Sequence, residues 1–272
     1  MKIYIHQHLG LGDFIMCNGL IRHILSVRPK KDTLHLFCRN WHTECIKFMY
    51  RDEKRIQIIT IDGSKDEYPQ VEKYIKDLKD KNNEFIKIGH DFYQATFNLN
   101  LDKDNPWPCD LVFYKQFNIP FNFRFTKSFW KRDKKKELKV FKKLVGSKKK
   151  YAFVHDDPKR NLNINNKRIS SDLKIIRNDT KYQIFDYAMI LENATELHLM
   201  ESSFRQMAET LKFKKTKLFL YKGRGGEHAI SLYNKKTKKW IGTSKKWTII
   251  KEKITHDEKG FLTKYKHLFN RK

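Results

Sequence analysis

The sequence has no long apolar run and no apolar leader. No stretch approaches the roughly 18 consecutive apolar residues that a transmembrane helix needs. The opening residues, MKIYIHQHLGLGD, turn polar too soon to form the apolar core of a signal peptide. We therefore expect a soluble, cytoplasmic chain.

Cysteine is also scarce, with four residues at uneven spacings and no C-x-x-C pair. This pattern predicts reduced thiols and excludes a disulfide framework. One cluster of cysteine and histidine joins Cys38 and Cys45 with His35 and His42. It lacks the paired two-residue spacing of structural zinc modules, so no metal site is predicted.

Acidic residues are few beside the basic ones: 31 aspartates and glutamates face 58 lysines and arginines, which gives a formal charge of +27. Such a charge attracts polyanions at low salt, so phosphates or an anionic membrane surface are possible partners. Most of the basic residues are lysines, which lack the bidentate geometry that nucleic-acid readers obtain from arginine. A solvated, lysine-rich surface with no partner is the simpler explanation of the charge.

The remaining composition is that of a folded protein, with 39% hydrophobic and 14% aromatic residues. Apolar strand-like runs alternate with helix-like periodicity through the first half of the chain. Strands are predicted at residues 3–6, 34–38, 56–61 and 85–88, and helices at 14–25, 42–50 and 68–81. Strand, helix, strand at this spacing predicts a parallel sheet covered on both faces.

The alternation stops after residue 101 and restarts at residue 151. Strands are then predicted at 151–155, 197–200 and 217–221, and helices at 184–194 and 204–211. The prediction is an α/β protein with two Rossmann-like lobes facing a central cleft. Its parts are an N-terminal lobe (1–130), a basic linker (131–150), a C-terminal lobe (151–254) and a final helix (255–272).

The first candidate site is the glycine turn Gly10-Leu11-Gly12-Asp13 between the first strand and the first helix. Ile15 stands where a dinucleotide fingerprint needs its third glycine, so a nicotinamide enzyme is excluded. At the carboxyl end of a parallel strand, Asp13 is placed to face a crevice and act as a general base. Asp13 as a mere cap of the first helix is an equally good interpretation.

The second candidate site follows the strand at 197–200, where Glu201, Ser202, Ser203 and Phe204 lead into a helix. Ser203 and Gln206 fit the S-x-x-Q pattern of a capping box. Free N–H groups at such a helix start form an anion site suited to a diphosphate.

Basic residues in two turns form a third, weaker candidate. His155, Lys159 and Arg160 follow the first strand of the second lobe, and Arg224 lies in the glycine-rich turn 223–226. Cations at these positions are suited to neutralising a departing diphosphate. Plain solvated turns are an equally good interpretation.

Two segments resemble nucleotide-sugar glycosyltransferases with the two-lobed GT-B fold, especially the heptosyltransferase-like family. These are Gly12-Asp13 at the opening of an amphipathic helix and the helix, strand and acidic turn at residues 187–204. Small glycosyltransferases of viruses and of bacterial surface-glycan clusters are similar in the turn Gly10-Leu11-Gly12-Asp13 and in His155-Asp156-Asp157.

The resemblance implies that the lobe at 1–130 binds the acceptor and the lobe at 151–254 binds the nucleotide sugar. It also implies a role for each matching residue. Asp13 matches the catalytic base, Glu201 an acidic residue that contacts the donor sugar, and residues 202–204 the phosphate-binding helix start. Glu201 replaces the commoner aspartate, and Gln206 stands where the family has histidine. These departures bear on the donor sugar more than on the fold.

The expected function is metal-independent, inverting transfer of a hexose or pentose from a UDP- or GDP-linked donor to a glycan hydroxyl. Donor-binding residues would be Gly12, His155, Arg160, residues 201–204 and Arg224. No cofactor is expected, because Asp102-Lys103-Asp104, the one D-x-D match, lies in the polar break between the lobes. Expected partners are the nucleotide sugar, the glycan and an anionic membrane surface.

The alternative is a basic nucleic-acid-binding protein without catalytic activity. It rests on the charge of +27 and on the aromatic residues between 113 and 130, on which bases could stack.

Overall fold

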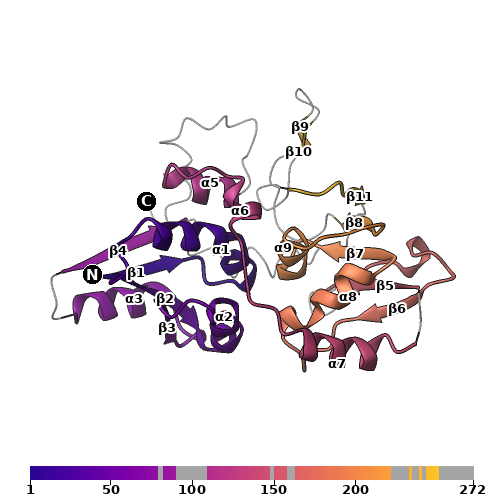
Figure 1. The fold of residues 1–272 in the computed structure, drawn as a ribbon, viewed down its shortest axis with the longest axis horizontal. Coiled ribbons are helices and arrows are strands. Elements are labelled where there is room, and N and C mark those ends of the chain that lie inside the picture. The colour runs from indigo at the N-terminus through magenta and orange to yellow at the C-terminus, as the bar shows by residue number, and fades with distance from the viewer. Residues whose placement is uncertain are drawn as a thin grey trace.

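The computed structural model describes residues 1–78, 82–89, 109–147, 150–157, 163–221, 233–234, 239–240 and 243–250, which form two α/β lobes side by side (Figure 1). The strands of the N-terminal lobe pair in the order β3-β2-β1-β4, and all are parallel. Their bounds are β1 (Lys2–Gln7), β2 (Thr33–Arg39), β3 (Ile56–Ile61) and β4 (Asn83–Ile88). The helices of this lobe are α1 (Leu11–Ser26), η1 (Asn40–His42), α2 (Thr43–Tyr50), α3 (Glu67–Lys76), α5 (Cys109–Gln116) and α6 (Phe123–Thr126).

The C-terminal lobe repeats this plan with a five-stranded parallel sheet in the order β11-β8-β7-β5-β6. The bounds are β5 (Tyr151–His155), β6 (Lys174–Arg177), β7 (Glu196–Met200), β8 (Lys217–Tyr221) and β11 (Thr248–Ile250). Its helices are α7 (Lys134–Leu144), η3 (Asn166–Arg168), η4 (Ile184–Tyr187), α8 (Ala188–Asn193) and α9 (Ser203–Ala208). Two short antiparallel strands, β9 (Tyr233–Asn234) and β10 (Lys239–Trp240), form a separate pair.

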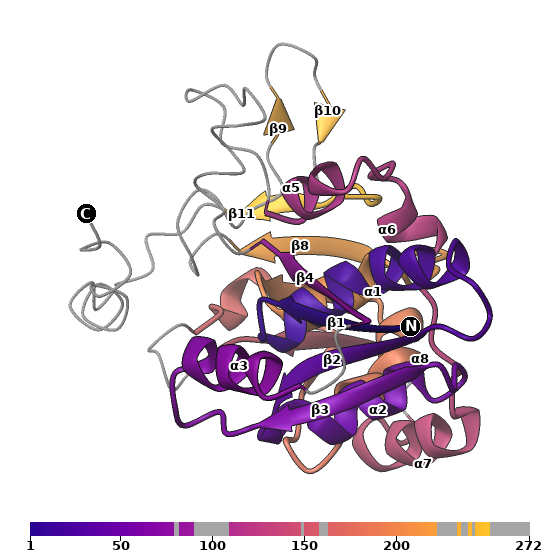
Figure 2. The same cartoon turned by 90° about the vertical axis from the view of Figure 1, so that its left-hand side faces the viewer.

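The central strands of both parallel sheets are buried, because helices cover the faces of such sheets. Five of the six residues of β1 and all five of β7 are buried, as in sheets with both faces covered. Figure 2 shows α3 on one face of the N-terminal sheet, where the Tyr74 ring lies 5.9 Å from the Tyr4 ring of β1. The predicted α/β class with two parallel sheets is confirmed, and β6 and β11 are additional strands that the sequence patterns did not predict.

Helices α5 and α6 lie on α1 in both views (Figures 1 and 2). Gly19 makes this approach possible, because a Cβ at that position would lie 2.2 Å from the Phe123 carbonyl oxygen. The Tyr114 hydroxyl then accepts from the Leu20 N–H and donates to the Met16 carbonyl, both at 3.0 Å. These are the two groups that an α-helix joins directly, so a side chain of α5 is inserted into the backbone ladder of α1.

The described chain crosses between the lobes from α6 to α7 (Figure 1). Helix α7, which lies in the predicted linker, packs on α8 and η4 of the C-terminal lobe. Arg132 anchors the segment between the lobes to the C-terminal lobe. Its guanidinium contacts Glu137 of α7 and lies 2.7 Å from Glu192 of α8. The boundaries at 130, 150 and 254 stay predictions, and the helix predicted at 255–272 lies outside the described residues.

Within the described ranges, no helix combines the length and the apolar character that crossing a bilayer requires.

Candidate functional site

Asp13 lies in the first turn of α1, directly after the end of β1. Gly10 is the N-cap residue of that helix, and its backbone N–H donates a hydrogen bond to the Asp13 carboxylate. The side chain therefore makes the backbone half of a capping box. Gly10 leaves room for this fold-back, since a Cβ there would lie 2.6 Å from Asp13 Oδ2. The capping interpretation is thus realised. A carboxylate can accept more than one hydrogen bond, so capping and proton transfer are compatible.

The surroundings of Asp13 favour its protonated form. Burial raises the pKa of the Asp13 carboxyl above its ordinary value, and the charge of Glu67 adds to this rise. Positive charge on His8 and Arg39 acts in the opposite direction on the same pKa but does not cancel the rise. A carboxylate with a raised pKa is a better proton acceptor near neutral pH, as a general base requires.

Asp13, His8, Arg39 and Glu67 form what we call the N-terminal cluster. Arg39 Nη2 lies 2.6 Å from Glu67 Oε2, and His6 Nε2 lies 3.5 Å from the other carboxylate oxygen. Burial alone would raise the pKa of Glu67, but the hydrogen bonds from His6 and Arg39 lower it. His8 is held by the Gly89 carbonyl oxygen, 2.7 Å from its Nε2. The cluster thus places a fixed Arg39–Glu67 ion pair beside Asp13.

Sequence reasoning missed His8, Arg39 and Glu67 as site residues. A signal was present, because Arg39 ends β2, His8 follows β1 and Glu67 begins the helix after β3. The carboxyl ends of parallel strands meet at one edge of a sheet, so polar residues at these ends gather there.

Glu201, Ser202, Ser203 and Gln206 form the C-terminal cluster, at the start of α9 directly after β7. The predicted capping box on Ser203 is wrong. The helix begins one residue earlier than that pattern requires, with Ser202 as an extended N-cap (φ −163°, ψ 175°) and no side-chain cap. Gln206 cannot reach back as a capping residue, because its amide donates to the Glu201 carboxylate.

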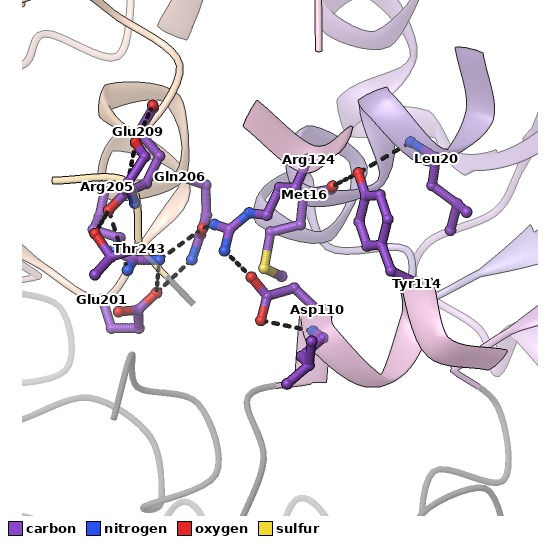
Figure 3. Close-up of polar contacts among 12 residues, drawn as sticks. Met16, Leu20, Asp110, Tyr114, Arg124, Glu201, Arg205, Gln206, Glu209 and Thr243 are labelled. Carbon is purple, nitrogen blue, oxygen red and sulfur yellow. Dashed lines mark hydrogen bonds and ion pairs between the residues drawn. The ribbon is translucent and has the colours of Figure 1, made fainter. Parts of the chain in front are cut away.

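Two guanidinium groups surround Gln206 (Figure 3). Its Oε1 accepts from Arg205 Nη1 at 3.0 Å and from Arg124, which belongs to α6 of the other lobe. Arg124 also pairs with Asp110 of α5, and both side chains are almost fully buried. Sequence reasoning missed this buried network, because its members come from distant segments that carry no shared motif.

The two clusters meet where the first turns of α1 and α9 pack together. A Cβ on Gly12 would lie 3.7 Å from the Ser203 backbone nitrogen and 3.7 Å from Gln206 Cγ, which is ordinary contact. Gly12 is the neighbour of Asp13, so the fold brings the proposed base and the proposed phosphate-binding helix start to the same junction between the lobes. This is the arrangement that a reaction shared by both lobes requires.

His155 lies on the same side of the C-terminal lobe as the start of α9. Its ring centroid is 4.5 Å from that of Phe204, and its Nδ1 lies 2.8 Å from Asn178 Oδ1. Phe204 itself is buried between Phe153 and Tyr187. The predicted site residues Arg160 and Arg224, with Lys159 and the D-x-D match at 102–104, lie outside the described residues.

Other expectations concern metal and nucleic acid. Among the residues that the structure describes, no group of three or more histidine, cysteine, aspartate or glutamate side chains is placed to hold a metal ion. Phe113 and Tyr114, two of the aromatic residues on which bases were expected to stack, are fully buried. Their rings pack in the core and present no face to a nucleic acid.

Two proteins of known structure have the same arrangement of lobes. A glycosyl transferase of family 9 from Veillonella parvula matches with a TM-score of 0.57 and 10% identity, over 97% of this chain and 90% of that one. The ADP-heptose LPS heptosyltransferase II of E. coli matches with a TM-score of 0.50 and 11% identity, over 92% and 90%. No family model matches the sequence, and no curated protein matches it. The chain therefore has the two-lobed GT-B fold, as predicted.

Proposed function

We propose that the protein transfers a sugar from a nucleoside-diphosphate sugar to a hydroxyl group of a glycan acceptor. One observation carries the proposal: the helix start that bears Asp13 packs directly on the start of α9 in the opposite lobe. The fold supports it, because both structural neighbours are named as glycosyltransferases. The burial of Phe113, Tyr114 and Trp130 removes three of the stacking rings on which the nucleic-acid alternative rested.

In the proposed mechanism, Asp13 takes the proton of the acceptor hydroxyl as its oxygen attacks the anomeric carbon. The bond from that carbon to the donor's diphosphate oxygen breaks, and the electron pair leaves with the diphosphate. Attack from the side opposite the leaving group inverts the anomeric centre. The N–H groups at the start of α9, with Ser202, Ser203 and Arg160, would neutralise the departing charge in place of a metal ion.

The donor and acceptor classes follow from the same junction. UDP- or GDP-linked hexoses and pentoses are the predicted donors, and the structural likeness to the E. coli ADP-heptose transferase adds an ADP-linked sugar as a third class. The acceptor would be a viral or bacterial surface glycan. Positive charge, +27 in total, would attract an anionic donor or an acceptor held at an anionic membrane.

The test has a binding arm and a turnover arm. A thermal-shift screen of UDP-, GDP- and ADP-sugars should raise the melting temperature with one nucleotide class. Asp13→Asn should then lower transfer by about a thousandfold and leave donor affinity within twofold, because only the proton acceptor is lost. Unchanged turnover in that variant would contradict the role of Asp13. Tight polynucleotide binding with a steep salt dependence, and no shift with any nucleotide sugar, would support the nucleic-acid alternative.

A further inference from the structure

Arg124 is a buried cation that crosses from one lobe to the other. It belongs to α6 of the N-terminal lobe and is only 2% exposed. It pairs with Asp110 of its own lobe and donates to Gln206 of the C-terminal lobe (Figure 3). Burying a guanidinium is costly unless such partners compensate for the lost water. The contact to Gln206 is therefore a defined junction between the lobes.

The two guanidinium groups fix which way the Gln206 amide points. Arginine has only donors, so the amide must turn its oxygen towards Arg124 and Arg205. The amide NH2 group is then directed to the opposite side, where it donates to Glu201 Oε1. A histidine or an apolar side chain at position 206 could not accept from two arginines and donate to a carboxylate in this way.

The contact with Gln206 is made to one oxygen of the Glu201 carboxylate. Both the Gln206 amide and Arg205 Nη1, at 3.7 Å, approach the same oxygen, Oε1. The side chain is 9% exposed, so it has little freedom to adopt another rotamer. Its direction therefore depends on Gln206, and through Gln206 on Arg124.

Helix α6 is itself fixed to the helix that carries Asp13. Gly19 of α1 lies directly against the Phe123 carbonyl, one residue before Arg124. The chain of contacts thus runs from α1 through Arg124 and Gln206 to Glu201 and connects the proposed base with the proposed sugar contact.

We propose that Arg124 is a positioning residue that orients the Glu201 carboxylate towards the donor's sugar ring through the Gln206 amide. The N-terminal lobe then sets the sugar subsite of the C-terminal lobe, and a sugar-bearing donor is recognised only when the lobes are joined in this way. The inference rests on the proposed function, in which Glu201 contacts the donor sugar.

The experiment compares a nucleotide sugar with its own nucleoside diphosphate by calorimetry. The ligand pairs are UDP-glucose with UDP, GDP-mannose with GDP, and ADP-glucose with ADP, and the pair that the unaltered chain binds best is used throughout. Arg124→Gln and Gln206→Leu should each lower affinity for the nucleotide sugar by about tenfold, the value of one hydrogen bond to a charged group. Affinity for the nucleoside diphosphate should stay within twofold. Loosening of the lobes alone would weaken both ligands together.

A double variant and a control complete the design. Arg124→Gln combined with Gln206→Leu should lose no more than either single variant, because both break the same path to Glu201. Gln206→Leu keeps the Asp110–Arg124 ion pair, so it tests the path even where Arg124→Gln unfolds the chain. Arg132→Gln removes a different inter-segment ion pair, with Glu137 and Glu192, and should lower stability without changing the ratio of the two affinities.

The outcomes separate this inference from the proposed function. If Glu201→Gln lowers affinity for the nucleotide sugar but Arg124→Gln and Gln206→Leu do not, the positioning role is wrong and the proposed function stands. Additive losses in the double variant, or equal losses for both ligands, also overturn it. If the unaltered chain binds none of the six ligands, both proposals fail, and that failure is visible before any variant is made.

Discussion

Each lobe buries a carboxylate near the junction, but the two are treated in opposite ways. In the N-terminal lobe, burial raises the pKa of Asp13, and the carboxylate accepts a hydrogen bond from the Gly10 backbone N–H. In the C-terminal lobe, burial would also raise the pKa of Glu209, but the charges of Arg205 and Arg124, together with hydrogen bonds from Thr243 and Ser244, lower it. The comparison shows that the balance between burial and the charged or hydrogen-bonding partners, rather than burial alone, decides whether a carboxylate is a proton acceptor or a permanent anion.

Removing Arg205 should break the C-terminal side of this comparison with the largest effect. Arg205→Met leaves the Glu209 and Glu201 carboxylates without their buried guanidinium and the Gln206 oxygen with Arg124 alone. We expect a loss of about 3–5 kcal/mol in the free energy of unfolding. Urea denaturation measures it. Arg28→Met, which removes a half-exposed pair with Glu84, should cost less than about 1 kcal/mol.

The pH dependence of the same variant has a definite sign. The lowered pKa of Glu209 contributes stability above its unfolded pKa, and this stability is lost as pH falls through the folded pKa. Arg205→Met should therefore be destabilised most at neutral pH, and its stability should fall less steeply on acidification than that of the unaltered chain. An equal loss at every pH would contradict the assignment.

Gly10→Ala should disturb the N-terminal side while leaving the fold intact. The new Cβ would lie 2.6 Å from Asp13 Oδ2, so the carboxylate must move. The backbone at Gly10 (φ −74°, ψ 144°) is open to alanine. We expect kcat to fall by about a hundredfold, since misplacement of a reacting group is costly. The matched control is Gly63→Ala, whose Cβ would crowd the exposed Trp41 ring instead of Asp13 and should change kcat less than threefold.

Glu67→Gln should bring the pKa of Asp13 closer to the lowered pKa of Glu209 in the C-terminal lobe. The charge of Glu67 raises the pKa of Asp13, so its removal should lower that pKa. Because the rate rises as Asp13 ionises, the acid limb of kcat/KM should move to lower pH. Glu84→Gln is the control and should leave the limb in place. A shift to higher pH would mean that Asp13 is not the titrating group.

The smallest effect concerns the cost of keeping Asp13 ionised. A raised carboxyl pKa means that the folded state binds the proton more tightly, so stability is lost as pH rises from the unfolded to the folded pKa. Asp13→Asn should therefore stabilise the chain at pH 8, by less than about 1 kcal/mol. The gain should disappear in acid. Melting curves at pH 4 and pH 8 measure the difference.

Much of the fold could be predicted because strand and helix periodicity are local properties. The patterns at residues 3–6 and 14–25 predicted β1 and the core of α1, and hence that Asp13 lies at the carboxyl end of a strand. The pattern S-x-x-Q failed at Ser203 because a capping box depends on the residue at which the helix begins after the strand, and composition does not encode that residue. Ser202 takes the extended N-cap position instead.

The network around Arg124 could not be predicted for a different reason. Gln206 lies 82 positions after Arg124, and Asp110 belongs to a different helix from Arg124. Each of the three residues is unremarkable in its own segment. These residues are brought together because α6 packs against Gly19 of α1 and contacts α9. Only three-dimensional packing creates these contacts. The buried polar residues of this protein are determined by tertiary structure, whereas its strands and helices are determined locally.

The insertion of Tyr114 into α1 has a consequence for how the N-terminal lobe assembles. The hydroxyl that bridges Met16 and Leu20 comes from a residue 94 positions beyond Leu20. The hydrogen bonding in the middle of α1 is therefore completed only by a residue that is distant in the sequence. Complete formation of α1 is thus coupled to the docking of α5. A fragment that ends after β4 would hold every strand of its sheet and still lack the group that finishes its first helix.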